Sequence, residues 1–361
     1  MKYQRVLTEI YHKPWAILPE KFATISEIVQ LRASGEKLTQ EEIRARLGPH
    51  LSAAAQRDGA QSYGVVAVIP IYGVISHRMN LMSQISGGTS AEKLTAQFRQ
   101  ALADPSVKAI VFDVDSPGGS VEGVPELADE IMKSRSKKKT VAVANSMAAS
   151  AAYWLASAAD ELVVIPSGQV GSVGVFCEHQ DFSKALESEG VKVNLISAGK
   201  FKVEGNPYEP LSDEARAALQ GKVEAFYEMF VKSVAKGRGV AQTAVREGFG
   251  QGRMVLAADA VKGRMADRVA TMDETLSRLG ASGAPKKMAA AAGLPAISAG
   301  ALDGCECECA ECMDDNCFGC TNAECADLEC AVEGCPNQAR ASAAAPKRPP
   351  RALLERELDL H

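Results

Sequence analysis

This sequence of 361 residues has no excess of basic residues and no long apolar run. Only one cysteine precedes residue 305. Its formal net charge of -5 gives no positive field for phosphates, so we expect no nucleic acid among its direct partners. Apolar runs such as residues 65–75 are too short to cross a bilayer. Residues 1–15 carry charges where a signal peptide needs its apolar segment, so we expect a cytoplasmic chain without a membrane partner.

What is present is typical of a soluble globular protein, with 46% hydrophobic and 24% charged residues. Shifts in composition divide the chain into three parts. We expect an N-terminal helical arm and linker over 1–63, a main domain over 64–280, and a low-complexity linker with a Cys-rich segment over 281–361. Thr39 and Glu42 have capping-box spacing and mark a helix start in this arm, which either binds substrate or packs on the domain.

The centre of the main domain is the run NSMAASAAYW, residues 145–154. The β-branched stretch at 140–144 predicts a buried strand, and the alanine-rich stretch after it predicts a helix. Ser150 therefore lies near a strand-to-helix junction, where its hydroxyl is reachable and the backbone can approach a substrate closely. This serine is a candidate nucleophile, although alanine and serine runs also serve helix packing.

Other serines compete with Ser150 for this role: Ser116, Ser120 and Ser146. We choose Ser150 because it opens the helix, where the amide of Ala151 can join in binding an oxyanion. Upstream, the apolar strand that starts at residue 107 breaks abruptly at a turn. Such a turn leaves backbone N–H groups pointing outward to hold an oxyanion, and its residues are Pro117, Gly118 and Gly119.

A general base is the second requirement. Residues 191–210 begin as another strand, whose end delivers Lys200 and Lys202 into a Gly- and Pro-containing loop. A lysine held in a dry cleft loses its proton and can act as base to a serine. Because these two lysines lie two residues apart, they face the same side of a continuing strand, and alternation cannot choose between them.

The order of the remaining elements predicts the architecture. The core opens with a strand over 65–75, and a helix follows from Ser90, with Thr89 and Glu92 at capping-box spacing. Strands separated by helices predict a mostly parallel sheet, in which the loops at the carboxyl ends of the strands build the site.

A long helix is predicted over 212–237, with Ser212 as its cap and acids in its first turn. Its apolar residues share one face and are expected to be buried: Leu219, Val223, Phe226, Phe230 and Val234.

Four motifs follow one another: DSPGG at 115–119, SMAAS at 146–150, GSVGV at 171–175 and AGKFKVEGNPYEPLSDE at 198–214. In this order and spacing, residues 14–275 resemble the signal-peptide-peptidase-A-like family of Ser–Lys serine peptidases. More narrowly, they resemble the head-maturation (prohead) proteases of tailed phages. The resemblance implies an α/β fold of the ClpP/crotonase-like spiral type, to which the helical arm and a flexible Cys-rich tail are added.

The resemblance also assigns the chemistry. It puts the nucleophile at the last serine of SMAAS, Ser150, and its G-x-x-K pattern selects Lys202 rather than Lys200 as the base. Gly119 and Ala151 would form the oxyanion hole, with no cofactor needed for catalysis. Further backbone positions are implied to bind substrate: Gly118, Gly171, Ser172 and Val173.

The implied partners are protein substrates, namely scaffold, capsid or portal proteins that are cut inside an assembling procapsid in the host cytoplasm. Relatives form rings or stacked oligomers, so we expect a homo-oligomer whose isolated monomers are inactive. Three other interpretations stay open: a cytoplasmic signal-peptide-peptidase-like protease of host origin, a crotonase-type acyl-CoA enzyme without a role for Lys202, and an inactive scaffold protein on the same fold. His179 is an alternative base, as in the ClpP-type Ser–His–Asp peptidases.

The tail has a different composition, with nine cysteines between 305 and 335. Dense thiols in a cytoplasmic protein favour metal over disulfides. Two CxxC pairs predict a zinc or mixed thiolate site, an iron–sulfur spacing is also present, and a reduced, flexible tail is the alternative. The predicted metal ligands are Cys309, Cys312, Cys317 and Cys320. Leucines at 353, 354 and 358 predict a short docking helix at the end of the chain.

Overall fold

The computed structural model describes residues 13–33, 38–47, 59–78 and 88–288. The predicted metal ligands Cys309, Cys312, Cys317 and Cys320, and the predicted docking helix, lie outside the described residues.

The main sheet of the described residues has nine strands, and its central pairs are parallel. These strands are β2 (Gln61–Gly64), β3 (Val66–Tyr72), β6 (Ala109–Ser116), β8 (Lys139–Ala149), β9 (Glu161–Val164), β10 (Gln169–Gly171), β11 (Met254–Leu256), β12 (Arg268–Val269) and β13 (Ala281–Lys287). β3 pairs parallel with β6, β6 with β8, and β8 with both β9 and β10. Antiparallel pairs lie towards the edges, so the predicted mostly parallel sheet is confirmed.

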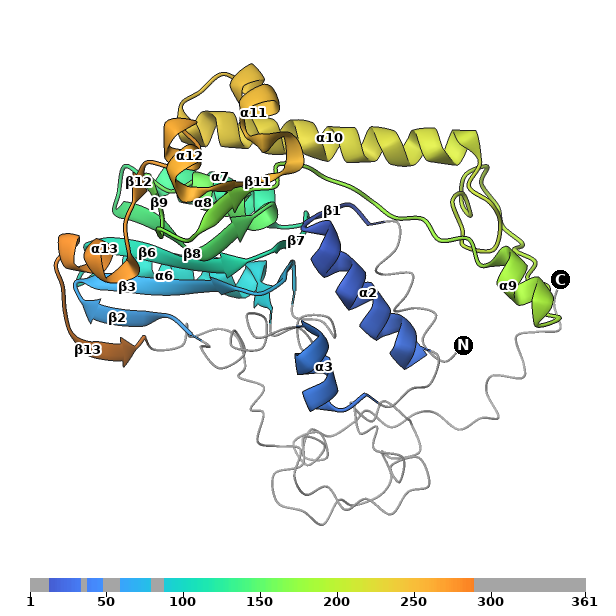
Figure 1. The fold of residues 1–361 in the computed structure, drawn as a ribbon, viewed down its shortest axis with the longest axis horizontal. Helices are drawn as coiled ribbons and strands as arrows, with labels where there is room; N and C mark the ends of the chain where they lie inside the picture. The colour runs from blue at the N-terminus through green and yellow to red at the C-terminus, as the bar shows by residue number, and fades with distance from the viewer. Residues whose placement is uncertain (1–12, 34–37, 48–58, 79–87, 289–361) are drawn as a thin grey trace, which may run out of the picture. The chain divides into compact units, whose positions relative to one another are not determined.

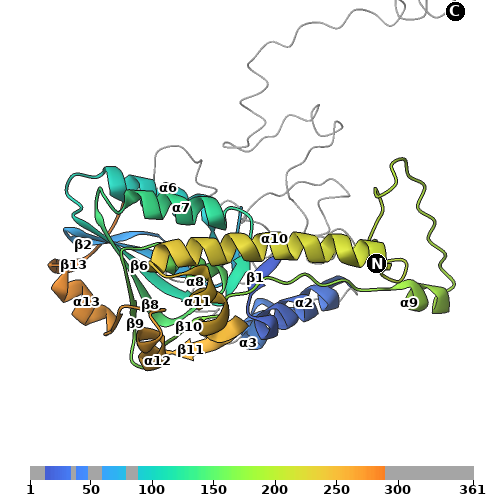
Figure 2. The same ribbon diagram turned by 90° about the horizontal axis from the view of Figure 1, so that it is seen from above.

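Helices cover both faces of this sheet (Figures 1 and 2). They are α2 (Pro19–Ala33), α3 (Gln40–Leu47), α6 (Ala91–Ala103), α7 (Val124–Ser134), α8 (Ala151–Ser157), α9 (Ser183–Ser188), α10 (Asp213–Arg238), α11 (Gln242–Gly248), the short 3-10 helix Gly250–Gly252, α12 (Ala257–Lys262) and α13 (Met272–Arg278). The apolar residues of α6, α7, α8 and the end of α10 form one core with the sheet. Those of α13 pack on its other face.

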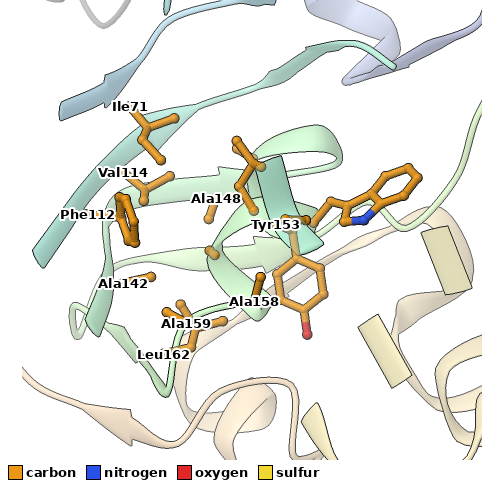
Figure 3. Close-up of a cluster of buried hydrophobic side chains, with 14 of the residues drawn as sticks. Ile71, Phe112, Val114, Ala142, Ala148, Tyr153, Ala158, Ala159 and Leu162 are labelled. Carbon is orange, nitrogen blue, oxygen red and sulfur yellow. The ribbon is translucent and has the colours of Figure 1, made fainter. Parts of the chain in front are cut away.

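The helix α8 is held firmly in the larger core, part of which Figure 3 shows. The Trp154 ring stacks on Phe230 of α10, with ring centroids 4.4 Å apart. The Tyr153 hydroxyl donates to the Met265 carbonyl at 2.9 Å. Full burial of side chains of this size contributes about 1.5–3 kcal/mol each. The element that follows residue 150 is therefore fixed by packing as well as by its own hydrogen bonds.

A second sheet of four strands lies beside the first. Its strands are β1 (Trp15–Ile17), β7 (Gly118–Ser120), β4 (Ile75–Ser76) and β5 (Thr89–Ser90), in the order β1-β7-β4-β5. The single strand predicted over 65–75 is therefore wrong: β3 ends at Tyr72, and the chain turns at Gly73, with φ 64°, before it enters the second sheet as β4.

The predicted capping boxes are confirmed at one helix and corrected at another. The Thr39 hydroxyl accepts from the Glu42 amide at 3.2 Å, and Glu42 accepts from the Thr39 amide at 2.8 Å. At α6 the capping residue is Ser90, whose hydroxyl accepts from the amide of Lys93. Thr89, predicted as the cap, instead donates to the Tyr72 carbonyl at 2.7 Å and so joins the two sheets.

The strand predicted from 191 is wrong for the single chain. Residues 191–197 form no strand, and together with α9 they belong to an extension, residues 177–212, that leads away from the sheet to the first turn of α10 (Figures 1 and 2). The long helix predicted over 212–237 is confirmed, with the Ser212 hydroxyl accepting from the Ala215 amide. Of its predicted buried stripe, only Phe230 and Val234 are buried, because the first half of α10 lies beyond the sheet.

The ion pair between Arg238 and Asp267 joins the end of α10 to the sheet and generates a prediction. Two Arg238 nitrogens donate to the carboxylate at 2.7 Å each, and the Leu162 amide donates to it at 2.7 Å. Burial acts to raise the pKa of Asp267, but the hydrogen bonds from Arg238 and Leu162 outweigh burial and hold that pKa below its ordinary value. The carboxylate therefore stabilises the fold at neutral pH, and this contribution is lost as pH falls through the folded pKa.

We expect Asp267→Asn to lower the free energy of unfolding by about 1 kcal/mol at neutral pH, because solvent screens a pair that is partly exposed. The difference from the wild type should shrink as pH falls below the ordinary range of a carboxyl group. Urea denaturation followed over that pH range measures both, and the exposed Asp273→Asn serves as the matched control. A difference that grows towards acid would contradict this assignment.

Candidate active site

The structure places Ser150 at the predicted strand-to-helix junction. β8 ends at Ala149, α8 begins at Ala151, and Ser150 between them has φ 53° and ψ −115°. A positive φ is costly for a residue with a side chain, and such strain is concentrated at functional sites. Three of the five non-glycine residues with positive φ in the described chain are serines of this region: Ser146, Ser150 and Ser172.

The backbone around Ser150 is tied into the sheet. Its amide donates to the Gly171 carbonyl at 2.8 Å, and its Oγ donates to the Gly174 carbonyl at 3.4 Å. A Cβ on Gly171 would lie 2.7 Å from the Arg253 carbonyl oxygen, so this close passage of the chain needs a glycine. Ser172 and Val173, also predicted to bind substrate, are buried beside it.

The glycine turn passes the end of β8. A Cβ on Gly118 would lie 2.2 Å from the Ala16 carbonyl oxygen and 3.0 Å from that of Ala149, and one on Gly119 would lie 1.8 Å from the Ile75 carbonyl oxygen. Side chains at these positions are therefore excluded by backbone contact on three sides. The two glycines bring backbone amides into the immediate neighbourhood of the nucleophile candidate.

Two competing serines have other surroundings. The Ser116 hydroxyl donates to the Gly73 carbonyl at 2.6 Å and accepts from the Gly118 amide at 3.2 Å, so it fixes the turn. The Ser120 Oγ is buried and has no hydrogen-bond partner among the described residues.

The predicted bases lie in the extension. Lys202 is exposed in a turn where its amide donates to the Gly199 carbonyl at 3.1 Å, and it makes no hydrogen bond to Ser150, which is only 1% exposed. The Lys200 ammonium pairs with Glu214 at 3.0 Å. One chain by itself therefore does not bring Lys202 to Ser150.

The alternative base, His179, also belongs to the extension. Its Nε2 lies 3.2 Å from the carbonyl oxygen of Asn206, in the same loop that carries the two lysines. The His179 ring therefore contacts the backbone of the extension itself, as an ordinary polar residue of this segment would.

Two groups near the site were missed by sequence reasoning. Asp113 is 8% exposed and accepts hydrogen bonds from the Tyr72 hydroxyl and, at 3.0 Å, from the Asn145 amide group. This carboxylate fixes the first residue of the central run. The second group is the backbone of Phe176, which pairs with an extended strand from the N-terminal region. The only signal for Asp113 was its place as an acidic residue inside the otherwise apolar run 109–114 of β6, and no local pattern marked Phe176.

No group of three or more His, Cys, Asp or Glu residues suited to a metal ion occurs within residues 13–288 where they are described. No described helix is both long and apolar enough to span a membrane.

Comparisons with known proteins now bear on this site. Residues 132–284 match the sequence profile of peptidase family S49, and residues 67–170 match that of Clp protease. The chain is thus similar to the S49 peptidases over these residues, and the resemblance to the signal-peptide-peptidase-A-like family is confirmed. The Clp match and the parallel sheet confirm the ClpP-like α/β fold class.

The relatives include two phage proteins. Capsid assembly protease C of Escherichia phage lambda is 39% identical over 207 residues, covering 56% of this chain and 46% of that protein. Head-tail preconnector protein GP5 of Enterobacteria phage P21 is 37% identical over 180 residues, covering 50% of this chain and 36% of that protein. The chain therefore spans less than half the length of either phage relative.

A cellular relative and a solved structure are more distant. The putative signal peptide peptidase SppA of Enterococcus faecium is 28% identical over 189 residues, covering 52% of this chain and 55% of that protein. A ClpP1 mutant from Listeria monocytogenes is 16% identical with a TM-score of 0.37, covering 58% of this chain and 94% of that chain, a similarity too weak to bear on the fold.

The surroundings of Cys177, the residue after Phe176, predict a thiol of low reactivity that does not act as a nucleophile. Burial raises the pKa of its thiol above the ordinary value, and the positive charge of Lys222 opposes this only in part. Since only the thiolate is reactive, Cys177 should react with iodoacetamide more slowly in the folded protein than after unfolding in urea. Its rate should still be rising above about pH 9.

Peptide mapping by mass spectrometry distinguishes this thiol from those of the tail, and Cys177→Ser identifies its signal. A folded-state rate equal to or above the unfolded one would show an activated thiol instead.

Proposed function

We propose that this chain is a serine endopeptidase in which Ser150 is the nucleophile and Lys202 is the general base. The observation that carries the proposal is the strained serine between β8 and α8, with the Gly118–Gly119 turn packed against the end of the same strand. An acyl-transfer enzyme needs this combination of a positioned hydroxyl and backbone amides that receive negative charge.

The mechanism follows from these positions. Neutral Lys202 takes the proton of Ser150 as its Oγ attacks a peptide carbonyl, and the amides of Gly119 and Ala151 hold the oxyanion. Ala151 is the first residue of α8, where helix N–H groups have no acceptor within the helix. The lysine then protonates the leaving amine, and water hydrolyses the acyl-enzyme. Protein substrate is the only co-reactant besides water, and catalysis needs no cofactor.

Lys202 would come from a neighbouring copy. A lysine with an ordinary pKa of about 10.4 must be desolvated to be neutral at working pH, yet Lys202 is exposed in the single chain. The extension around it also exposes large apolar side chains: Val191 (47%), Val193 (37%), Leu195 (44%), Ile196 (99%) and Phe201 (52%). An exposed apolar patch of this kind marks an interaction site.

Alternation in this patch indicates how the copies would meet. Val191, Val193 and Leu195 occur at every second position, as in a strand, although this segment pairs with no strand among the described residues. Pairing with the edge of a neighbouring copy would form the predicted strand and bury Lys202 at that copy's cleft. We therefore propose a homo-oligomer in which isolated monomers are inactive.

The substrates we propose are scaffold, capsid or portal proteins, cut within the procapsid in the host cytoplasm. This rests on the two phage relatives, a capsid assembly protease and a head-tail preconnector protein. The peptidase domain would occupy residues 64–280, with 1–63 as a helical arm and linker and 281–361 as a cysteine-rich tail whose thiols would bind zinc.

Complementation tests both the dyad and its location. Ser150→Ala and Lys202→Ala should each lower hydrolysis of an unfolded protein substrate by about a thousandfold, because the serine and lysine act as a unit. When the two variants are assembled together, sites with an intact serine and an intact lysine should reappear, up to about a quarter of all sites in a symmetric oligomer.

Lys200→Ala is the matched control and should keep its activity, because Lys200 pairs with Glu214. Activity in either single variant would refute the dyad. Two inactive variants whose mixture stays inactive would place both groups in one chain. Coenzyme A binding with no dependence on Lys202 would favour an acyl-CoA enzyme.

A further inference from the structure

The N-terminal strand β1 lies between two segments of the candidate site. On one side it pairs antiparallel with β7, the strand of the glycine turn. On the other side the Trp15 amide donates to the Phe176 carbonyl at 2.7 Å, and the Phe176 amide donates to the Trp15 carbonyl at 3.0 Å. An extended segment bonded along both edges is how a protein recognises a peptide by strand addition.

The register of β1 involves the proposed oxyanion amide. Leu18 donates to the Pro117 carbonyl at 2.9 Å, so this pair at the end of β1 is hydrogen-bonded. Bonded and non-bonded pairs alternate along an antiparallel ladder, and Ala16 opposite Gly119 is therefore the next bonded pair. The parallel partner of Gly119 on its other side is Ile75 in β4. The Gly119 amide thus faces the Ala16 carbonyl, where a substrate carbonyl would bind.

The same strand lies near the end of β8, which leads into the nucleophile candidate. Gly118 lies close to the carbonyl oxygens of both Ala16 and Ala149, and Ala149 is the residue before Ser150. The Ser150 Oγ lies 3.4 Å from the carbonyl of Gly174, two residues before the point where β1 pairs with Phe176. Ser150 itself is 1% exposed, so a substrate needs an opening in this region.

We propose that residues 13–18 form a self-inhibitory strand that occupies the cleft in the manner of a peptide substrate and must leave before a protein substrate binds. This inference rests on the proposed function, since it takes the hydroxyl of Ser150 and the amide of Gly119 as the reacting site. The partner it assigns to the cleft is an extended peptide that runs antiparallel to β7, with its acyl-side carbonyl on Gly119.

The side chains of the strand divide between two apolar clusters, with Ala16 in the large core and Trp15 in a smaller one. Trp15 packs on Phe22 of α2 with ring centroids 5.4 Å apart, and Phe22 meets Phe176 at 5.3 Å. Ile17 joins the same small apolar cluster, which is separate from the large core. β7 keeps its parallel neighbour β4 when β1 is absent. Release of three paired residues would therefore open the cleft without dismantling the glycine turn.

A reversible crosslink tests the proposal within one protein. Trp15 and Ser120 face each other as a non-bonded antiparallel pair, whose short Cα separation suits a disulfide. In the full-length variant Trp15→Cys with Ser120→Cys, oxidation should lower peptide hydrolysis by about tenfold or more, because only molecules with an empty cleft bind substrate. Reduction should restore a rate at least equal to that of the wild type. The two single variants, treated with the same oxidant, control for the other cysteines.

Fluorescence provides a second test in which Trp15 is retained. Trp154→Phe leaves Trp15 as the single tryptophan, and phenylalanine can keep the stack on Phe230. A peptide aldehyde that bonds to Ser150 should displace β1 and shift the Trp15 emission to longer wavelength. Ser150→Ala in the same background is the control and should show no shift.

The two tests separate the inhibitory strand from the proposed function. Full activity of the oxidised crosslinked protein, or a stoichiometric aldehyde adduct on Ser150 with unchanged Trp15 emission, would overturn the inhibitory strand alone. Failure of the aldehyde and of every substrate to react at Ser150 in the wild type would overturn the proposed function. Loss of activity on oxidation together with the emission shift would support the proposal.

Discussion

This structure depends on points where two backbone segments lie so close together that only glycine fits between them. The end of β8, the glycine turn and β1 meet at Gly118 and Gly119, where an added Cβ would overlap neighbouring carbonyl oxygens. The same device recurs behind α8, where a Cβ on Gly237 of α10 would lie 2.3 Å from the Ser157 carbonyl oxygen. Arg135 closes that junction by donating to carbonyls at the end of α8 and to the Gly237 carbonyl at 3.0 Å. The helix that begins at the nucleophile candidate is thus fixed at both ends.

Features set by neighbours in the sequence could be predicted. The β-branched strand at 140–144, the alanine-rich helix after it and the abrupt glycine turn together placed Ser150 at the carboxyl edge of a parallel sheet, where the structure has it. The long helix α10 was predictable because Ser212 and the acids after it satisfy its first turn. Each of these depends on hydrogen bonds or packing within a few residues of the motif.

Features set by distant or absent partners could not be predicted. Val191, Val193 and Leu195 have the alternation of a strand, but a strand also needs a partner, and the part of the chain that the structure describes supplies none. The insertion of β1 between β7 and Phe176 joins residues about 100 and 160 positions apart, and three residues such as Trp15–Ile17 carry no periodic signal. The identity of the base depends on the same missing partner, which is why Lys202 remains a prediction.

The length of α10 has a mechanical meaning. Its 26 residues span about 39 Å at the usual rise, with Phe230 and Val234 anchored on the core at one end and the extension attached at the other. The length of α10 therefore sets the distance between Ser150 and Lys202 of the same chain. One inserted residue in its exposed half would swing the loop by about 100°, whereas seven would restore the phase at a longer reach. In the proposed homo-oligomer, the number of residues in α10 would therefore set the spacing between successive subunits.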